Sequence, residues 1–122
     1  MKTIPSRLRR ALALVALVLA VSACSHEDLV RIAFEGEGAT PAQQEQAVQV
    51  ARCESGMNYQ AISPGGGNWG LFQINRVHAA KVNGMGYAWD EMLLPWQNAV
   101  VAAQIWSEQG WRPWSCARHL GY

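Results

Sequence analysis

The chain contains no internal repeat, no low-complexity segment and no block of like-charged residues. The absence of a charged block argues against an interaction tail. The histidines His26, His78 and His119 have no metal-ligand spacing among themselves or with the cysteines, so we expect neither a metal site nor a cofactor. The longest apolar run, residues 11–21, is too short to cross a bilayer comfortably.

Residues 1–23 have the pattern of a secretory signal peptide. A basic segment precedes the apolar run, and the small residue Ala23 stands at a cleavage point. Removing residues 1–23 leaves six basic and nine acidic side chains, a formal charge of −3. No basic patch then remains, and we expect no nucleic-acid partner. The basic residues lost with the signal peptide are Lys2, Arg7, Arg9 and Arg10.

The three cysteines are an odd set for an exported protein. Val21-Ser22-Ala23-Cys24 resembles a bacterial lipobox, which implies a lipoprotein acylated on Cys24 and anchored on the outer side of the cell membrane, facing the wall. The alternative is ordinary cleavage after Ala23 and secretion. Cys53 and Cys116 are then left to form a disulfide, whose closed loop would stabilise the fold by on the order of 4 kcal/mol.

Residues 24–27 are expected to be a short tether and residues 28–122 a single, mainly α domain. A first helix is predicted over residues 28–34, with Asp28 as its cap. A second has the start signal Thr40-Pro41-Ala42-Gln43 and is expected to run to about Ser55, with Gly56 at its C-terminal end.

The second half of the chain is expected to hold a turn region and two more helices. Residues 63–68 have no helical or strand period, which predicts a loop or irregular hairpin. Asn75 is predicted to cap a helix over residues 76–82. A loop with Tyr87, Trp89 and Asp90 should follow, and then the last long helix, from Pro95 or Trp96 to Gly110.

Glu54 is the candidate catalytic residue. Ala47, Val50, Ala51 and Glu54 recur at helical spacing, so the carboxylate shares the face of the apolar stripe. Partial dehydration there would raise its pKa toward the range useful for general acid catalysis. The alternative is a solvated glutamate at a helix end.

Three motifs occur in order: Glu54-Ser55, the block Gly70-Leu71-Phe72-Gln73-Ile74-Asn75, and a helix with Asn98. Over residues 28–118 this pattern resembles the lysozyme-like superfamily, especially the small lytic transglycosylase domains of bacterial cell-wall enzymes. The resemblance implies an α+β lysozyme-like fold and an enzyme that cleaves peptidoglycan glycan strands. We expect it to act as a monomer.

The resemblance also implies how the bond is cut. Animal-type lysozymes carry an aspartate just ahead of the matching block, where this chain has Asn68 and Trp69. A lytic transglycosylase needs only one carboxylate, here Glu54, to cleave between N-acetylmuramic acid and N-acetylglucosamine and leave a 1,6-anhydro product. Asp90 could be a substitute second acid, although its spacing favours a loop or cap role.

Further site residues follow from the same resemblance. Gln73 and the backbone of residues 70–72 would line the cleft, and Ser55 and Asn98 would support Glu54, although Gln73 and Asn98 could instead make structural hydrogen bonds. Trp69 and Tyr87 are candidates for stacking on sugar rings, whereas Trp106 should be buried. The predicted substrate-binding set is Ser55, Asn68, Trp69, Gly70, Phe72, Gln73, Tyr87 and Asn98.

One departure from the pattern of the larger transglycosylases leaves open whether the product is the 1,6-anhydro form or the hydrolysed form. Larger transglycosylases carry an Ala-Tyr-Asn-x-Gly segment after the asparagine helix, whereas this chain has Gly110-Trp111-Arg112-Pro113-Trp114-Ser115-Cys116. That ending is similar to the compact muralytic domains of the resuscitation-promoting-factor type. A hydrolytic muramidase, a non-catalytic peptidoglycan-binding lipoprotein and a wall-remodelling accessory of a secretion or conjugation machine are the alternatives.

Overall fold

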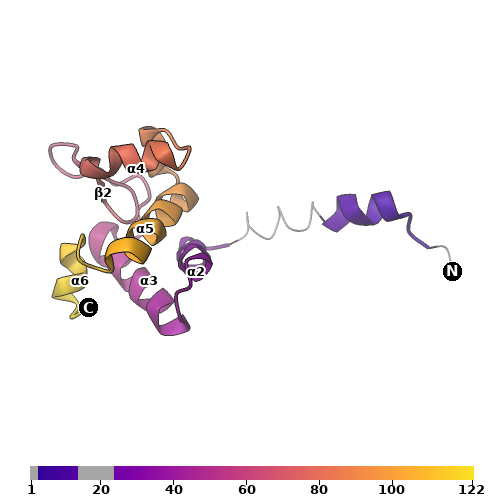
Figure 1. The fold of residues 1–122 in the computed structure, drawn as a ribbon, viewed down its shortest axis with the longest axis horizontal. Coiled ribbons are helices and arrows are strands. Elements are labelled where there is room, and N and C mark those ends of the chain that lie inside the picture. The colour runs from indigo at the N-terminus through magenta and orange to yellow at the C-terminus, as the bar shows by residue number, and fades with distance from the viewer. Residues whose placement is uncertain (1–2, 14–23) are drawn as a thin grey trace.

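The computed structural model describes residues 3–13 and 24–122 (Figure 1). Most of the predicted signal peptide's apolar run and its cleavage site fall in residues 14–23, outside the described residues. Residues 6–13 are helical and exposed. No helix within the described ranges is both long and apolar enough to cross a membrane.

Helix α2 (His26–Gly36) begins earlier than predicted. Its cap is Ser25, whose hydroxyl accepts a hydrogen bond from the backbone N–H of Asp28 at 3.1 Å. Asp28 was expected to be the cap, but its carboxylate instead pairs with Arg31 at 3.0 Å, one turn further along the helix. The expected tether over residues 24–27 is therefore helical from His26 onward.

Helix α3 (Pro41–Ser55) has the predicted start and end. Thr40 Oγ1 accepts from the Gln43 N–H at 3.2 Å, and Gln43 Oε1 accepts from the Thr40 N–H at 2.9 Å, which completes a capping box. Gly56 takes the left-handed conformation, with φ of 61°, and its N–H donates to the Arg52 carbonyl. These signals place Glu54 in the last turn of the helix.

Residues 63–67, within the stretch predicted as a loop or irregular hairpin, form a turn that leads into a short hairpin. Strands β1 (Asn68–Trp69) and β2 (Ile74–Asn75) pair antiparallel, with Asn68 opposite Asn75 and Trp69 opposite Ile74. An isolated bridge between Ile62 and Trp69 extends the pairing toward the preceding loop. The turn of the hairpin lies within the Gly70–Asn75 block, and the end of that block, Asn75, lies opposite Asn68.

The remaining elements are η1 (Arg76–His78), α4 (Ala79–Gly84), η2 (Trp89–Leu93), α5 (Pro95–Gln109) and α6 (Ser115–His119). Asn75 caps this region as predicted, since its Oδ1 accepts from the Val77 N–H at 3.0 Å, but the first turn is 3₁₀ rather than α. The segment predicted as a loop around Trp89 and Asp90 contains η2. The sequence did not predict α6, which is only one turn long.

Helix α2 packs against both α3 and α5 (Figure 1). Phe34 on α2 is fully buried. The centroid of its ring lies 5.4 Å from that of Phe72, 5.4 Å from that of Trp106 and 5.6 Å from that of Trp111. Truncating such a ring costs about 3–5 kcal/mol. Trp106, expected to be buried, is only half-buried at the edge of this cluster. The mainly α architecture predicted from the sequence is confirmed.

A disulfide joins Cys53 of α3 to Cys116 of α6, with their Cα atoms 5.9 Å apart. The two cysteines are 63 residues apart in the chain. The bond holds the C-terminal segment against the end of α3, directly beside Glu54. The predicted pairing is confirmed.

Candidate active site

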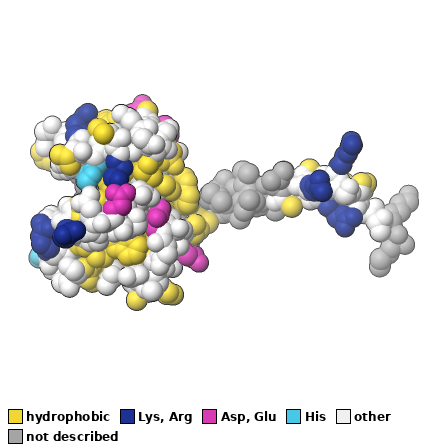
Figure 2. Space-filling view, in the orientation of Figure 1, with side chains coloured by type: hydrophobic (Ala, Val, Ile, Leu, Met, Phe, Trp, Pro, Cys, Tyr) yellow, Lys and Arg dark blue, Asp and Glu magenta, His cyan; other side chains and the backbone are white. Residues whose placement is uncertain are grey.

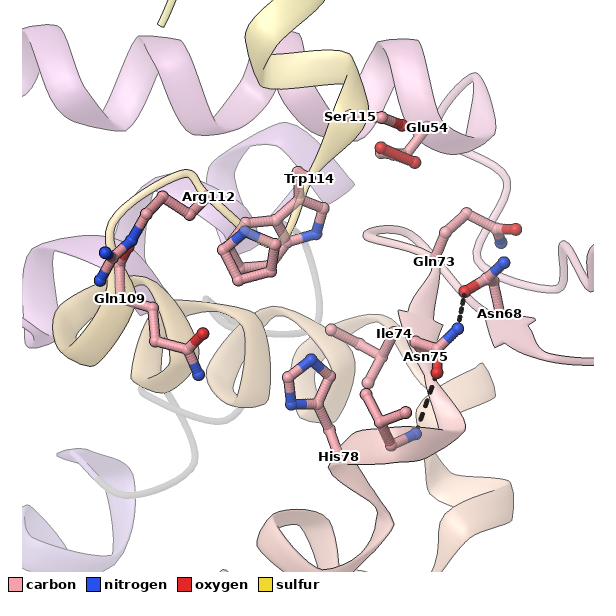
Figure 3. A pocket seen from close by; sticks show the side chains of 12 residues that line it. Glu54, Asn68, Gln73, Ile74, Asn75, His78, Gln109, Arg112, Trp114 and Ser115 are labelled. Carbon is pink, nitrogen blue, oxygen red and sulfur yellow. Dashed lines mark hydrogen bonds between the residues drawn. The ribbon is translucent and has the colours of Figure 1, made fainter.

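A cleft of about 690 Å³ opens between the end of α3, the hairpin with η1, and the segment that leads into α6. Figure 2 shows the surface hollowed between two lobes, and Figure 3 shows the side chains around the pocket. Segments from three distant parts of the sequence thus meet in one groove. The lining residues are Glu54, Asn68, Gln73, Ile74, Asn75, Val77, His78, Gln109, Arg112, Pro113, Trp114 and Ser115.

Glu54 is half-buried at one side of this cleft, beside Ser115 (Figure 3). The backbone N–H of Cys116 donates to its Oε1 at 3.4 Å. Burial raises the pKa of the Glu54 carboxyl above its ordinary value of 4.5, and the long hydrogen bond from Cys116 opposes that rise only in part. The carboxyl group therefore holds its proton at higher pH than a solvated glutamate does.

The turn that carries Gln73 is held in an unusual backbone conformation. Gln73 has a φ of 50°, which is uncommon for a residue other than glycine. Its Nε2 donates to the carbonyl oxygens of Ala61 at 3.1 Å and Gly70 at 3.0 Å. These bonds fix the side chain in the cleft wall, and strain of this kind is typical of functional sites.

Asn98 braces the same turn from behind. It is fully buried, its Oδ1 accepts from the Phe72 N–H at 2.9 Å, and its Nδ2 donates to the carbonyls of Trp69 and Met92, each at 2.9 Å. Gly70 lies against this amide with a φ of 79°, and a Cβ built there would overlap both the Met92 carbonyl and the Asn98 Nδ2. Only glycine fits at this position.

The C-terminal segment forms a further wall of the cleft. Trp114 is almost fully buried, and its indole N–H donates to the Phe72 carbonyl at 3.0 Å. The disulfide at Cys116 holds this segment beside Glu54. Residues 109–115 were not predicted to form a cleft wall, although the predicted pairing of Cys53 with Cys116 already places Ser115 next to the catalytic candidate.

Three of the predicted site residues, Glu54, Asn68 and Gln73, line the cleft. Asn68 Oδ1 accepts from Asn75 Nδ2 at 2.9 Å, so a second amide, which was not among the predicted site residues, belongs to the same wall. Ser55 faces its own helix instead, where its hydroxyl donates to the Ala51 carbonyl at 3.1 Å.

The other predicted residues do not line the cleft. Gly70, Phe72 and Asn98 are buried behind it and are absent from its lining. Trp69 and Tyr87, expected to stack on sugar rings, are half-buried against the core. Because both rings pack against the core, they are not among the residues that line the cleft.

Trp69 is also committed to local contacts. Its indole N–H donates to the Gly66 carbonyl at 2.9 Å, and its ring contacts Trp89 and lies under the guanidinium of Arg76.

Asp90 is exposed on η2 and is absent from the cleft lining. Of the described residues that line the cleft, Glu54 is the only acid. His78 lies across the groove, where burial and then Lys81 lower its pKa, against the opposing effect of Glu108. No group of three or more potential metal ligands comes together in the described part of the chain.

Comparison with known proteins identifies one family. The family model described as the transglycosylase SLT domain matches residues 32–110. That range contains Glu54, the hairpin block and the helix with Asn98, while the cleft wall from Arg112 to Ser115 lies beyond it. Searches of curated proteins and of solved structures found no match.

Proposed function

Because the chain belongs to the transglycosylase SLT domain family, a family of glycosidases and transglycosylases that act on peptidoglycan, we propose that it is a lytic transglycosylase with Glu54 as its single catalytic carboxylate. Its substrate would be the β-1,4 bond between N-acetylmuramic acid and N-acetylglucosamine. The cleft is a groove open to solvent, as a polymeric substrate requires.

One observation carries this proposal: Glu54 is the only acid among the described lining residues, and burial raises its pKa. Hydrolysis by two carboxylates would need a partner acid at about 5–10 Å. The side chains that line the cleft with Glu54 include the amides Asn68 and Gln73 and the indole of Trp114, none of which is an acid. A single carboxyl group that keeps its proton is suited to act first as an acid and then as a base.

The proposed reaction proceeds in two steps. Protonated Glu54 gives its proton to the glycosidic oxygen, and the bond from that oxygen to C1 of N-acetylmuramic acid breaks. The carbonyl oxygen of the sugar's own N-acetyl group supports the positive charge that develops at C1.

In the second step the 6-hydroxyl oxygen of the same sugar attacks C1, and Glu54, now ionised, takes the hydroxyl proton. The new C1–O6 bond makes the 1,6-anhydro ring, no water is consumed, and Glu54 ends protonated as it began.

The test compares the wild-type protein with Glu54→Gln on purified cell-wall sacculi. Turbidity loss and release of soluble sugar should fall by at least about 100-fold in Glu54→Gln, since general acid catalysis contributes about 10²–10⁴-fold. Glu35→Gln, a matched change at an exposed position on α2, should keep wild-type activity.

Co-sedimentation with sacculi should remain unchanged in Glu54→Gln. If the wild-type protein binds sacculi and releases nothing, it is a wall-binding protein, and the enzymatic proposal fails.

We also propose export and anchoring of the protein through an acylated Cys24, on the support of the lipobox-like sequence. Cys24 stands immediately before Ser25, the cap of α2, so an acyl chain there would hold the folded domain close to the membrane surface. Cys24→Ala should move the protein from the membrane fraction to the soluble fraction. Full retention in the membrane fraction would contradict the anchor.

A further inference from the structure

We propose that Arg112 is a specificity-determining residue that binds the carboxylate carried by the acidic substituents of peptidoglycan, at the end of the cleft away from Glu54. This inference rests on the proposed function. A glycan strand of peptidoglycan carries a lactyl group on every N-acetylmuramic acid. That group ends in a free carboxylate or continues into a stem peptide with carboxylates of its own.

Arg112 occupies a defined place in the groove. It lies in the short connection between α5 and α6 and lines the cleft. Figure 3 places it with Gln109 on the opposite side of the pocket from Glu54, with the ring of Trp114 between them. A sugar bound near Arg112 is therefore not the one that reacts at Glu54, and a contact there would act on binding.

The connection that carries Arg112 is well braced. The Arg112 Nε donates to the Gln109 carbonyl at 3.2 Å, and the Arg112 carbonyl accepts from Arg118 Nη1 at 2.9 Å. The Trp114 N–H donates to the Trp111 carbonyl at 3.0 Å, which closes the turn around Arg112. The backbone and the Nε of Arg112 are thus fixed, while its two terminal amino groups extend beyond these contacts.

The charge of Arg112 is not used inside the fold. Among residues 3–13 and 24–122, ion pairs join Arg31, Arg52 and Lys81 to acids, and none includes Arg112. A guanidinium presents paired N–H donors that match the two oxygens of a carboxylate. Arg112 has those donors on the wall of a groove.

The negative charge of the rest of the protein leaves Arg112 as a charge that can attract an acidic glycan. Without residues 1–23 the chain has a formal charge of −3, and Glu54 adds negative charge to the cleft whenever it is ionised. An acidic polymer is repelled by such a surface. The only other titratable base that lines the described cleft is His78, and burial lowers its pKa, so it carries less positive charge than a solvated histidine does. Arg112 is then the attractive charge that faces the strand.

The experiment compares wild type, Arg112→Gln and Arg112→Lys on three glycans. Turnover is measured on intact sacculi and on sacculi stripped of stem peptides by an amidase, which keep the lactyl carboxylate. A chitin oligosaccharide, which has neither a carboxylate nor the proposed cleavage site, is used for binding alone. Arg52→Gln is the matched control, because Arg52 is exposed on α3 and does not line the cleft. Binding of the same glycans is measured in a Glu54→Gln background.

Arg112→Gln should raise KM on the carboxylate-bearing substrates about three- to tenfold, with little change in kcat, since an exposed charge-assisted contact lies at the low end of its range. Arg112→Lys should recover part of the loss. In the Glu54→Gln background, Arg112→Gln should leave binding of the chitin oligosaccharide unchanged. Turnover by Arg52→Gln should match wild type on both kinds of sacculi.

If Arg112→Gln raises KM on intact sacculi alone, the contact is with the stem peptide. If it raises KM on stripped sacculi, the contact is with the lactyl carboxylate. Binding weakened equally for all three glycans, or for none of them, would overturn the proposal. If the wild-type protein cleaves nothing, the proposed function has failed. The binding measurements then test the role of Arg112 independently of catalysis. A carboxylate contact still predicts that Arg112→Gln weakens binding of the acidic glycans and not of the chitin oligosaccharide.

Discussion

Gly70→Ala is expected to be among the most damaging single-methyl changes in this protein. Gly70 has a φ of 79°, which costs an alanine about 1–2 kcal/mol. The new methyl group also overlaps the Met92 carbonyl and the Asn98 amide. Overpacking of this kind costs about 1–3 kcal/mol, and displacing Asn98 breaks at least one buried hydrogen bond, worth about 1–3 kcal/mol when its partner is left unpaired.

These contributions amount to a loss of about 3–8 kcal/mol, against a total stability of about 5–15 kcal/mol for a domain of this kind. The control is Gly86→Ala, because Gly86 has a similar φ of 88° but a Cβ added there would meet no atom within 4 Å. It should lose only the backbone part, about 1–2 kcal/mol.

Urea unfolding followed by tryptophan fluorescence measures both variants. A free energy of unfolding for Gly70→Ala within about 1 kcal/mol of that for Gly86→Ala would refute the close-contact explanation. The double variant Gly70→Ala with Asn98→Ser should lose less than the sum of its parts, because the smaller side chain relieves one of the two overlaps.

Three further changes test the site and its support. Asn98→Ala removes three hydrogen bonds, two of them buried and one part-buried, and should lower the free energy of unfolding by about 3 kcal/mol or more. A loss under about 1 kcal/mol in urea would show that the amide is dispensable. Glu54→Gln should change stability with pH. Because burial raises the folded-state pKa of Glu54, the wild-type protein loses stability as pH rises from about 4.5 through that pKa, whereas the glutamine variant does not. Melting temperatures should therefore favour the variant more at pH 7 than at pH 4, and the reverse order would contradict the raised pKa. Replacing Cys53 and Cys116 by serine should cost on the order of 4 kcal/mol, and a melting temperature unmoved by the double change would contradict that role.

Local signals predicted the elements that carry Glu54. The capping box at Thr40 and Gln43, and the left-handed position at Gly56, depend on residues within one turn of each other, so the sequence alone determines the limits of α3. The predicted cap of α2 was wrong because Ser25 and Asp28 are both good cap residues. The choice between them depended on the pairing of Asp28 with Arg31.

Contacts between distant segments could not be predicted in the same way. The Trp114 indole reaches the Phe72 carbonyl across 42 residues, and the Cys116 amide reaches Glu54 across 62. No local pattern encodes such distances. Trp69 and Tyr87 were assigned to sugar stacking because aromatic rings suit that role, but the same rings also suit a core, and packing decided between the two.

Mass spectrometry of the products that the wild-type protein releases from sacculi tests the central claim most directly. Single-carboxylate catalysis by Glu54 predicts muropeptides that end in 1,6-anhydro-N-acetylmuramic acid, one water lighter than the hydrolysed form, and their absence with Glu54→Gln. Products with reducing ends from the wild-type protein would contradict the account, because water rather than the 6-hydroxyl would then be the nucleophile.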